Sequence, residues 1–214
     1  MNIETLRKAA GREEIDYPFL MSALSDYSRP RDKISVWLKS GELVRVKKGL
    51  YVFGKEAALS PFSHEILANL IYGPSAISLS YALSFYGLIP ERIPSITSVT
   101  HKRRKEFITP VGRFVYFYLP AQKYSVGIRL ESTSAGQQFL ISTPEKALCD
   151  QIYLIDKKIK LNTPNDIESY LFHDLRLDEE GLKNFSVAQL SAINESYQQK
   201  KINLLIQFIK KWKK

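Results

Sequence analysis

The feature that most constrains the fold is a short run, LVRVKKGLYVF, at residues 43–53. Two groups of strand-forming residues flank a Lys47-Lys48-Gly49 turn. A glycine readily takes the positive φ that a tight hairpin turn needs. Gly41, just before the run, has the place of a residue that ends a helix. The run therefore predicts a basic β-hairpin that follows a helix.

Three helical segments are expected before this hairpin. Residues 1–9 can form the first, Asp16 with Pro18 starts the second, and Ser28 with Pro30 starts the third. In the third segment an apolar stripe recurs at helical spacing and is expected to face inward: Ile34, Trp37 and Leu38. The opposite direction carries Asp32, Ser35, Val36 and Lys39, flanked by Arg31 and Lys33.

Positive charge is concentrated in the same region. The chain of 214 residues has a net charge of +9, and between Arg29 and Lys55 eight bases face only two acids. Helix, helix, helix and basic hairpin is the order of a winged helix-turn-helix. This order predicts that the helix from Pro30 to Ser40 enters the major groove of double-stranded DNA, while the hairpin tip reaches a phosphate or the minor groove. The predicted DNA-contacting residues are Ser28, Arg29, Arg31, Lys33, Ser35, Lys39, Arg45, Lys47, Lys48 and Tyr51.

The remainder of the chain mixes strands and helices. Strands are expected at 95–100, 113–120, 126–130 and 138–142. Helices are expected after the start signals Ser60-Pro61, Thr143-Pro144 and Thr163-Pro164, in the run AISLSYALSFYGLIP, and from about Ser186 to Trp212. The fold class is therefore α+β: a winged helix-turn-helix domain at 1–55, then a mixed α/β domain at 60–214 with a helical tail.

Several short motifs occur in the order found in one known family. WLKSGELVRVKKGLYVF resembles the end of the DNA-binding domain of the AbiEi family of antitoxins, whose pattern matches Gly41, Leu43, Arg45, Gly49 and Tyr51. Further matches follow at Ser78, Ser80, Ala82, Leu83, Gly87 and Leu88, at Val99-Thr100 with the basic stretch 101–105, and at 142–148 with Asp150. They span about residues 28–150, and the tail beyond Asp156 matches nothing.

The resemblance implies a transcriptional autorepressor of a type IV toxin–antitoxin operon. Its partners would be its own promoter DNA and a nucleotidyltransferase-like toxin, which such antitoxins often counter without a stable complex. The stretch HKRRKEF adds four consecutive bases that are candidates for a nucleic-acid or partner contact: Lys102, Arg103, Arg104 and Lys105. A solvated loop is an equally good account of them. Many helix-turn-helix repressors pair on palindromes, so a homodimer on DNA is compatible with the sequence.

Catalytic and metal-binding patterns are missing from the sequence. It has no phosphate-binding loop and no Gly-x-Ser-x-Gly, and His64, His101 and His173 lack metal-ligand spacing. We expect no catalytic residue, metal or cofactor, with Cys149 in the core, Glu145 in a cap and Asp150 in solvent. One cysteine, no apolar run of spanning length and no signal-peptide pattern predict a soluble cytoplasmic protein without a membrane partner.

Two other functions stay open at this stage. The C-terminal domain could be an enzyme, such as a phosphotransferase or nuclease whose site is assembled from scattered residues, with the winged helix as a targeting module. Alternatively, the winged helix could bind protein rather than DNA. The apolar stripe of the last helix, from Ile202 to Trp212, could form a dimer face, although we expect it to pack on its own domain.

Overall fold

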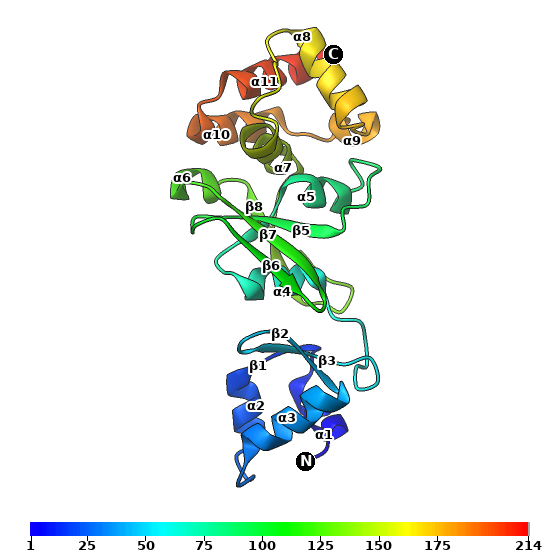
Figure 1. Cartoon of the computed structure of the whole chain (residues 1–214). Coiled ribbons are helices and arrows are strands. Elements are labelled where there is room, and N and C mark those ends of the chain that lie inside the picture. Colours follow the sequence, from blue (N-terminus) through cyan, green and yellow to red (C-terminus); the bar gives the residue numbers. More distant parts are fainter. Residues whose placement is uncertain (214) are drawn as a thin grey trace.

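The computed structural model describes residues 1–213, and over this range the chain is a mixed α+β protein. Figure 1 shows an elongated arrangement in three parts. Three helices with a small sheet form the amino-terminal end, a larger sheet lies in the middle, and a group of helices forms the other end. No helix among the described residues is long and apolar enough to cross a membrane.

The amino-terminal unit, residues 1–53, has the order of elements that the sequence predicts, with one addition. Its elements are α1 (Ile3–Ala10), β1 (Glu14–Asp16), α2 (Tyr17–Ala23), α3 (Pro30–Ser40), β2 (Leu43–Lys47) and β3 (Leu50–Phe53). Strand β1 was not expected, because three residues are too few to display an alternating pattern. It pairs antiparallel with β3, so that β3 is the central strand of a β1-β3-β2 sheet.

The helix ends of this unit mostly follow the sequence signals. The Asp16 side chain accepts a hydrogen bond from the Phe19 backbone N–H at 2.8 Å, and Gly41 ends α3 in the left-handed region. The expectation that Ser28 caps α3 is wrong, since Arg29 is the capping residue and makes no side-chain cap hydrogen bond. Pro30 fits the first position of the helix because its missing N–H would have no intrahelical partner there.

The two faces of the β2–β3 hairpin pack against different cores. Its residues Leu43, Tyr51 and Phe53 join a small core with residues of all three helices, including Leu6, Leu20 and Trp37. Val46, Leu50 and Val52 point the other way and join the larger core of residues 66–209. All four residues of β3 are buried. The hairpin is therefore shared between the amino-terminal unit and the rest of the molecule.

The larger sheet has six strands in the order β6-β7-β5-β4-β9-β8. These strands are β4 (Ala76–Ile77), β5 (Ser95–Thr100), β6 (Lys105–Thr109), β7 (Gly112–Tyr118), β8 (Ile128–Ser132) and β9 (Gln138–Ser142). Parallel pairing joins β5 to β7 and β4 to β9, and the other pairs are antiparallel. The sequence predicted β5, β7, β8 and β9 but not β4, which has two residues, nor β6, which overlaps the basic stretch.

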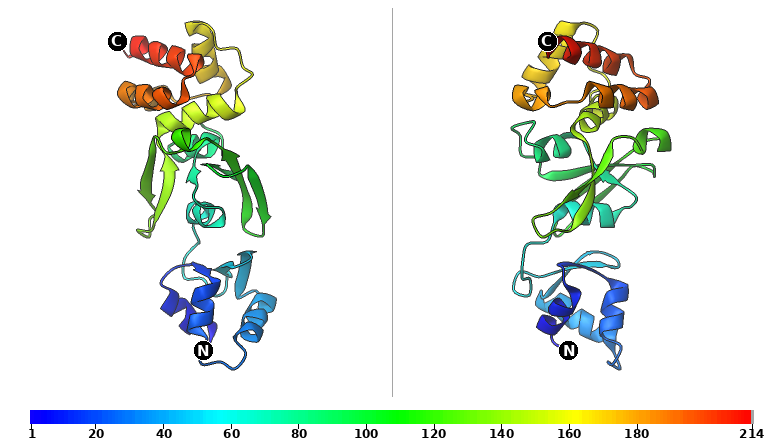
Figure 2. Two further views of the ribbon diagram at one scale, coloured as in Figure 1. Left: turned by 90° about the vertical axis from the view of Figure 1, so that its left-hand side faces the viewer. Right: turned by 180° about the vertical axis from the view of Figure 1, so that it is seen from behind.

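Helices lie on both sides of this sheet along the long axis of the molecule (Figures 1 and 2). Helix α4 (His64–Ile71) lies toward the amino-terminal unit, and α5 (Leu79–Phe85) and α7 (Pro144–Asp150) lie on the other side. Ser63 rather than Ser60 caps α4, with its Oγ accepting from the Ile66 N–H at 3.2 Å, so the expected Ser60-Pro61 start is wrong.

The far end of the molecule is helical. Beyond the short α6 (Ala121–Tyr124), its elements are the π-helix η1 (Gln151–Ile155), α8 (Pro164–Ser169), the π-helix η2 (Tyr170–Asp174), α9 (Glu179–Lys183), α10 (Val187–Tyr197) and α11 (Lys200–Trp212). The stripe on α11 packs on its own part of the chain: Ile202, Leu205 and Ile209 are fully buried in the larger core. The expectation for this stripe is thus confirmed.

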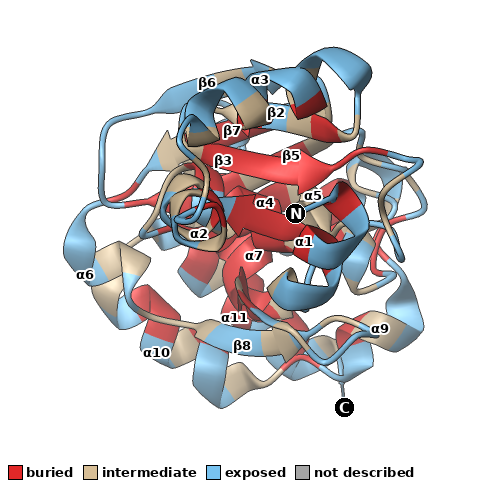
Figure 3. Cartoon of the chain, turned by 90° about the horizontal axis from the view of Figure 1, so that it is seen from below, coloured by how far each residue is buried: buried red, intermediate tan, exposed pale blue. Residues whose placement is uncertain are grey.

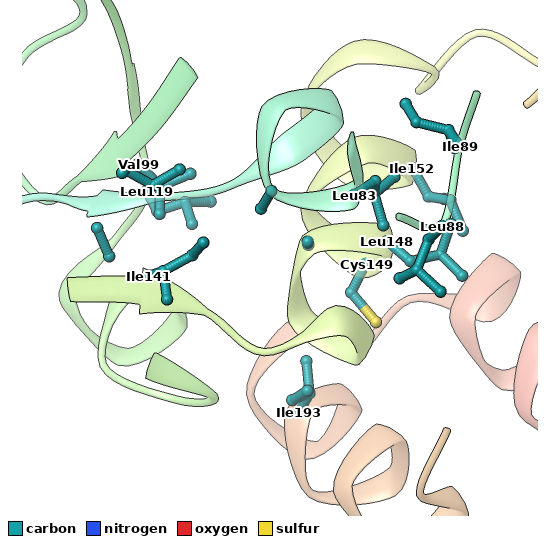
Figure 4. Close-up of a cluster of buried hydrophobic side chains, with 14 of the residues drawn as sticks. Leu83, Leu88, Ile89, Val99, Leu119, Ile141, Leu148, Cys149, Ile152 and Ile193 are labelled. Atoms are coloured by element: carbon teal, nitrogen blue, oxygen red, sulfur yellow. The ribbon is translucent and has the colours of Figure 1, made fainter. Parts of the chain in front are cut away.

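The larger core connects the sheet to these helices, as the buried side chains in Figure 4 show. Cys149 lies among Leu148, Ile152 and Ile193 in this core, as expected, and burial raises the pKa of its thiol far above the ordinary range. A buried thiol of this kind is inert.

Asp150 corrects an expectation, because it is fully buried rather than solvated. The Nζ of Lys146, also fully buried, donates to Asp150 Oδ1 at 3.1 Å, to the Tyr197 hydroxyl at 2.7 Å and to the Lys123 carbonyl at 2.9 Å. Ser78 Oγ donates to the second carboxylate oxygen at 2.6 Å. All three N–H groups of the ammonium are satisfied, and the network fastens α7 to α6, α10 and the start of α5.

Candidate nucleic-acid interface

The outer face of α3 is a polar surface that is open to solvent. Ile34 and Trp37 are buried beneath it. Five positions that the helical wheel places on or beside the outer face are exposed: Arg31, Asp32, Ser35, Val36 and Lys39. Seen from below, this helix is exposed along most of its length (Figure 3). Its width and position at the surface allow it to enter a major groove.

The basic residues at the start of α3 make few contacts that would restrain them. Arg29 has a side chain that is 84% exposed and reaches Asp32 only at 4.0 Å. Arg31 Nε donates to the Tyr17 hydroxyl at 3.1 Å. Ser28 is exposed, and Lys33 is half-buried with its ammonium 5.2 Å from the centre of the Trp37 ring. Among the described residues, Lys39 has no hydrogen-bond or ion-pair partner, and Arg29, just before the helix, has only the long contact with Asp32.

The hairpin presents two of its four predicted contact residues to solvent. Arg45 and Lys48 are exposed. Tyr51 is only 4% exposed and belongs to the small core, which corrects the expectation that it contacts DNA. Its ring lies 5.8 Å from the Arg45 guanidinium carbon and so supports that side chain instead.

Lys47 does not extend freely from the hairpin tip as expected. Its side chain is partly buried, and its ammonium donates to the carbonyl oxygen of Ile71 at the end of α4. Burial lowers the pKa of Lys47, and the positive charges of Lys105 and Lys102 lower it further. Cations are stabilised at a helix carboxyl end by the partial negative charge there. Lys47 therefore stabilises the contact between the hairpin and α4. Lys48 is the lysine of the turn that is exposed to solvent.

The second basic stretch converges on the same place. All four of its bases are exposed. Lys102 Nζ donates to the Gly73 carbonyl and lies 5.6 Å from the Tyr72 ring centre, while Lys105 lies 5.5 Å from the same ring. The Arg104 guanidinium lies over Phe117 at 5.0 Å, and Arg103 is exposed. The hairpin and the stretch 102–105, more than fifty residues apart in the sequence, thus both contact the end of α4 through their lysines.

Strand β6, which carries Lys105, lies on the same side of the long axis as α3. Figure 3 shows β6, α3 and β2 together at one edge of the molecule when it is viewed along its length, and the side view in Figure 2 agrees. The strand that follows the basic stretch is therefore on the side to which α3 belongs.

Two buried carboxylates fix the amino-terminal unit to the linker. Glu13 Oε1 accepts from the guanidinium of Arg7, from the Ser60 N–H at 2.9 Å and from the Ser60 hydroxyl at 3.0 Å. Glu14 Oε1 accepts from the Ser63 N–H at 2.7 Å. Burial acts to raise the pKa of Glu13, but the hydrogen bonds from Arg7 and Ser60 outweigh it and hold that pKa below its ordinary value. Sequence reasoning missed both residues, because their serine partners lie 47 and 49 residues away along the chain.

The titratable residues that the sequence singled out outside this surface have definite places in the structure. Over residues 1–213 no group of three His, Cys, Asp or Glu side chains could hold a metal ion. His101 and His173 are exposed as expected. The half-buried His64 has its Nε2 3.0 Å from the Val111 carbonyl oxygen. Glu145 is buried, accepts from the Ser186 N–H at 2.7 Å, and so holds the start of α10.

Comparison with known proteins adds no assignment: no protein-family model matches the chain, and a search of curated proteins finds no similar sequence.

Proposed function

We propose that this chain is a DNA-binding transcriptional repressor whose amino-terminal unit acts as a winged helix-turn-helix. Helix α3 would enter the major groove, and the β2–β3 hairpin would be the wing. The single observation that carries the proposal is the outer face of α3, where Arg29 and Lys39 are exposed and weakly restrained while Ile34 and Trp37 pack the inner face. Exposed cations at a helix surface can displace the counterions of DNA phosphates.

The set of contact residues is revised by the geometry. Ser28, Arg29, Arg31, Ser35 and Lys39 would contact DNA from α3 and its start, and Arg45 and Lys48 from the hairpin. Lys33 and Lys47 are partly buried and would act through the surface potential rather than by contact. The exposed bases 102–105 would touch the flanking backbone, because β6 lies on the same side as α3.

We further propose that the chain acts as the antitoxin of a toxin–antitoxin operon and controls its own promoter. Support comes from the resemblance to AbiEi antitoxins, whose motifs fall on α3 and the hairpin, on α5, on β5, and on the start of α7. The partner would be a nucleotidyltransferase-like toxin, countered by the C-terminal part.

The first test is a salt series of binding to the DNA upstream of the gene and to a scrambled duplex of equal length. We expect tight binding to the upstream duplex alone and a steep fall of affinity with salt. Lys39→Ala should lower the salt slope by about one, whereas Lys8→Ala on α1 should leave it unchanged. Equal and weak binding to both duplexes would contradict the repressor function.

The antitoxin function needs a separate test. The full chain should restore growth of cells that express the neighbouring toxin gene, and the double variant Arg29→Ala with Lys39→Ala should restore it equally well. A rescue that depends on DNA binding would show that repression alone accounts for the protection, and failure of the wild-type chain to rescue would refute the antitoxin function.

A further inference from the structure

A cavity of about 440 Å³ lies in the C-terminal part, and none of its lining residues belongs to α3, to the hairpin or to the basic stretch. It is bounded by the end of β7, by the π-helix η1 and by the start of α11. Its size is in the range of small-molecule sites. Tyr118, Tyr153, Lys157, Gln199 and Lys201 supply its polar and aromatic groups, and no acidic residue lines it. Such a lining favours an anionic ligand that has a planar part.

The aromatic groups are available for stacking. Tyr118, at the end of β7, is 51% exposed. Tyr153 is held in place by an edge contact with the ring of Tyr197 at 5.3 Å and by the Lys123 ammonium 4.8 Å from its ring centre. Nucleobases stack on such rings whatever their sequence, because every base has a π-face.

The cationic groups are positioned beside the rings. Lys201 Nζ donates to the carbonyl oxygens of Lys157 (at 2.7 Å) and Ile159, which fixes its position and leaves a third N–H for a ligand. Lys157 is exposed and forms no ion pair with a described residue. The nearest acid in the sequence, Asp156, is turned inward, since it accepts hydrogen bonds from Gln151 and Tyr170.

The backbone of this cavity is unusual as well. Three consecutive residues of η1 line it, Ile152, Tyr153 and Leu154. The π-helix is a rare conformation that is enriched at functional sites. The Gln199 amide, whose Nε2 donates to the Tyr197 carbonyl at 3.2 Å, lies opposite and keeps its side-chain oxygen available to accept from a base.

We propose that this cavity binds a nucleoside monophosphate, with the base against Tyr118 and the phosphate between Lys157 and Lys201. The Gln199 side-chain oxygen accepts a hydrogen bond from the exocyclic amine of the base. The site does not depend on the DNA-binding function, since it shares no residue with α3 or the hairpin.

The test is calorimetric titration of the full-length protein with AMP, in parallel with adenosine and with ribose 5-phosphate. We expect saturable binding of AMP and a loss of about tenfold or more for each of the two fragments. Lys157→Glu should abolish the heat, whereas Lys158→Glu, which makes the same change next to the cavity, should leave it unchanged. Tyr118→Phe should retain binding and Tyr118→Ser should weaken it.

Two results would overturn the proposal. One is the absence of AMP binding at millimolar concentration. The other is an equal loss of AMP affinity in the Lys157 and Lys158 variants, which would show that general surface charge accounts for the binding. A short single-stranded RNA serves as the competing arm. If RNA binds and AMP neither binds nor displaces it, the cavity binds a nucleic-acid strand and the mononucleotide assignment fails.

Discussion

Lys146 and Asp150 are one helical turn apart on α7, and neither side chain is exposed to solvent. An ion pair in this position is costly to form, but removing one partner leaves a buried charge without compensation. We expect Lys146→Met to lower the free energy of unfolding by about 3–5 kcal/mol. Urea unfolding followed by circular dichroism measures this change.

The matched control is the double variant Lys146→Met with Asp150→Leu, which removes both charges together. It should recover a large part of the lost stability, because a hydrophobic replacement of a buried pair is often close to neutral. Arg129→Ala, at the partly exposed pair with Glu131, should have a much smaller effect. A double variant no more stable than Lys146→Met would show that the hydrogen bonds to Ser78 and Tyr197, rather than the charge, dominate.

Glu13 gives the molecule an acid-sensitive contact. Its pKa is lowered in the folded chain from an ordinary value of 4.5, so its contribution to stability is complete above that pH and is lost as the pH falls through the folded pKa. We expect the wild type to lose stability below about pH 4.5 more steeply than Glu13→Gln does. Unfolding curves between pH 7 and 3 test this, and identical slopes for the two proteins would contradict it.

At the scale of elements, the hairpin places Lys47 and Lys48 in different environments, although the two lysines look equivalent in the sequence. If the proposed DNA binding holds, Lys48→Ala should weaken it on every sequence and lower the salt slope by about one, because the variant would lose one phosphate contact. Lys47→Met should change the slope much less and should instead reduce thermal stability, because Lys47 contacts the end of α4. Binding isotherms at several salt concentrations, with melting curves of both variants, provide the comparison.

Local signals predicted most elements of the fold, and contacts between distant residues account for the remainder. Asp16, Gly41 and Thr143 mark helix ends through their own side chains or backbone, so their roles could be read directly. Strand β4 has two residues and exists only because β5 and β9 flank it. At the candidate interface, the exposed face of α3 could be predicted from its helical wheel. The burial of Tyr51 depends on packing against the three helices, and the position of Lys47 depends on α4, and a pattern of eleven residues reveals neither.

At the scale of the whole molecule, the shared hairpin couples the two ends of the chain. Trp37 lies in the small core and Trp212 lies near Phe172 at the far end, so each tryptophan reports on one region. Variants that keep a single tryptophan, Trp37→Phe or Trp212→Phe, should show urea transitions at the same midpoint as the far-ultraviolet signal. Separate midpoints would show that the amino-terminal unit unfolds independently of the rest.

The burial of β3 on both faces limits how the protein can be re-engineered. A DNA-reading unit that stood on its own could be exchanged between proteins as a cassette. Here Val46, Leu50 and Val52 need the surface formed by α4 and its neighbours, and the linker needs Glu13 and Glu14. A chimera that borrows residues 1–53 must therefore bring the receiving surface of α4 with it, or the graft will expose an apolar hairpin and aggregate.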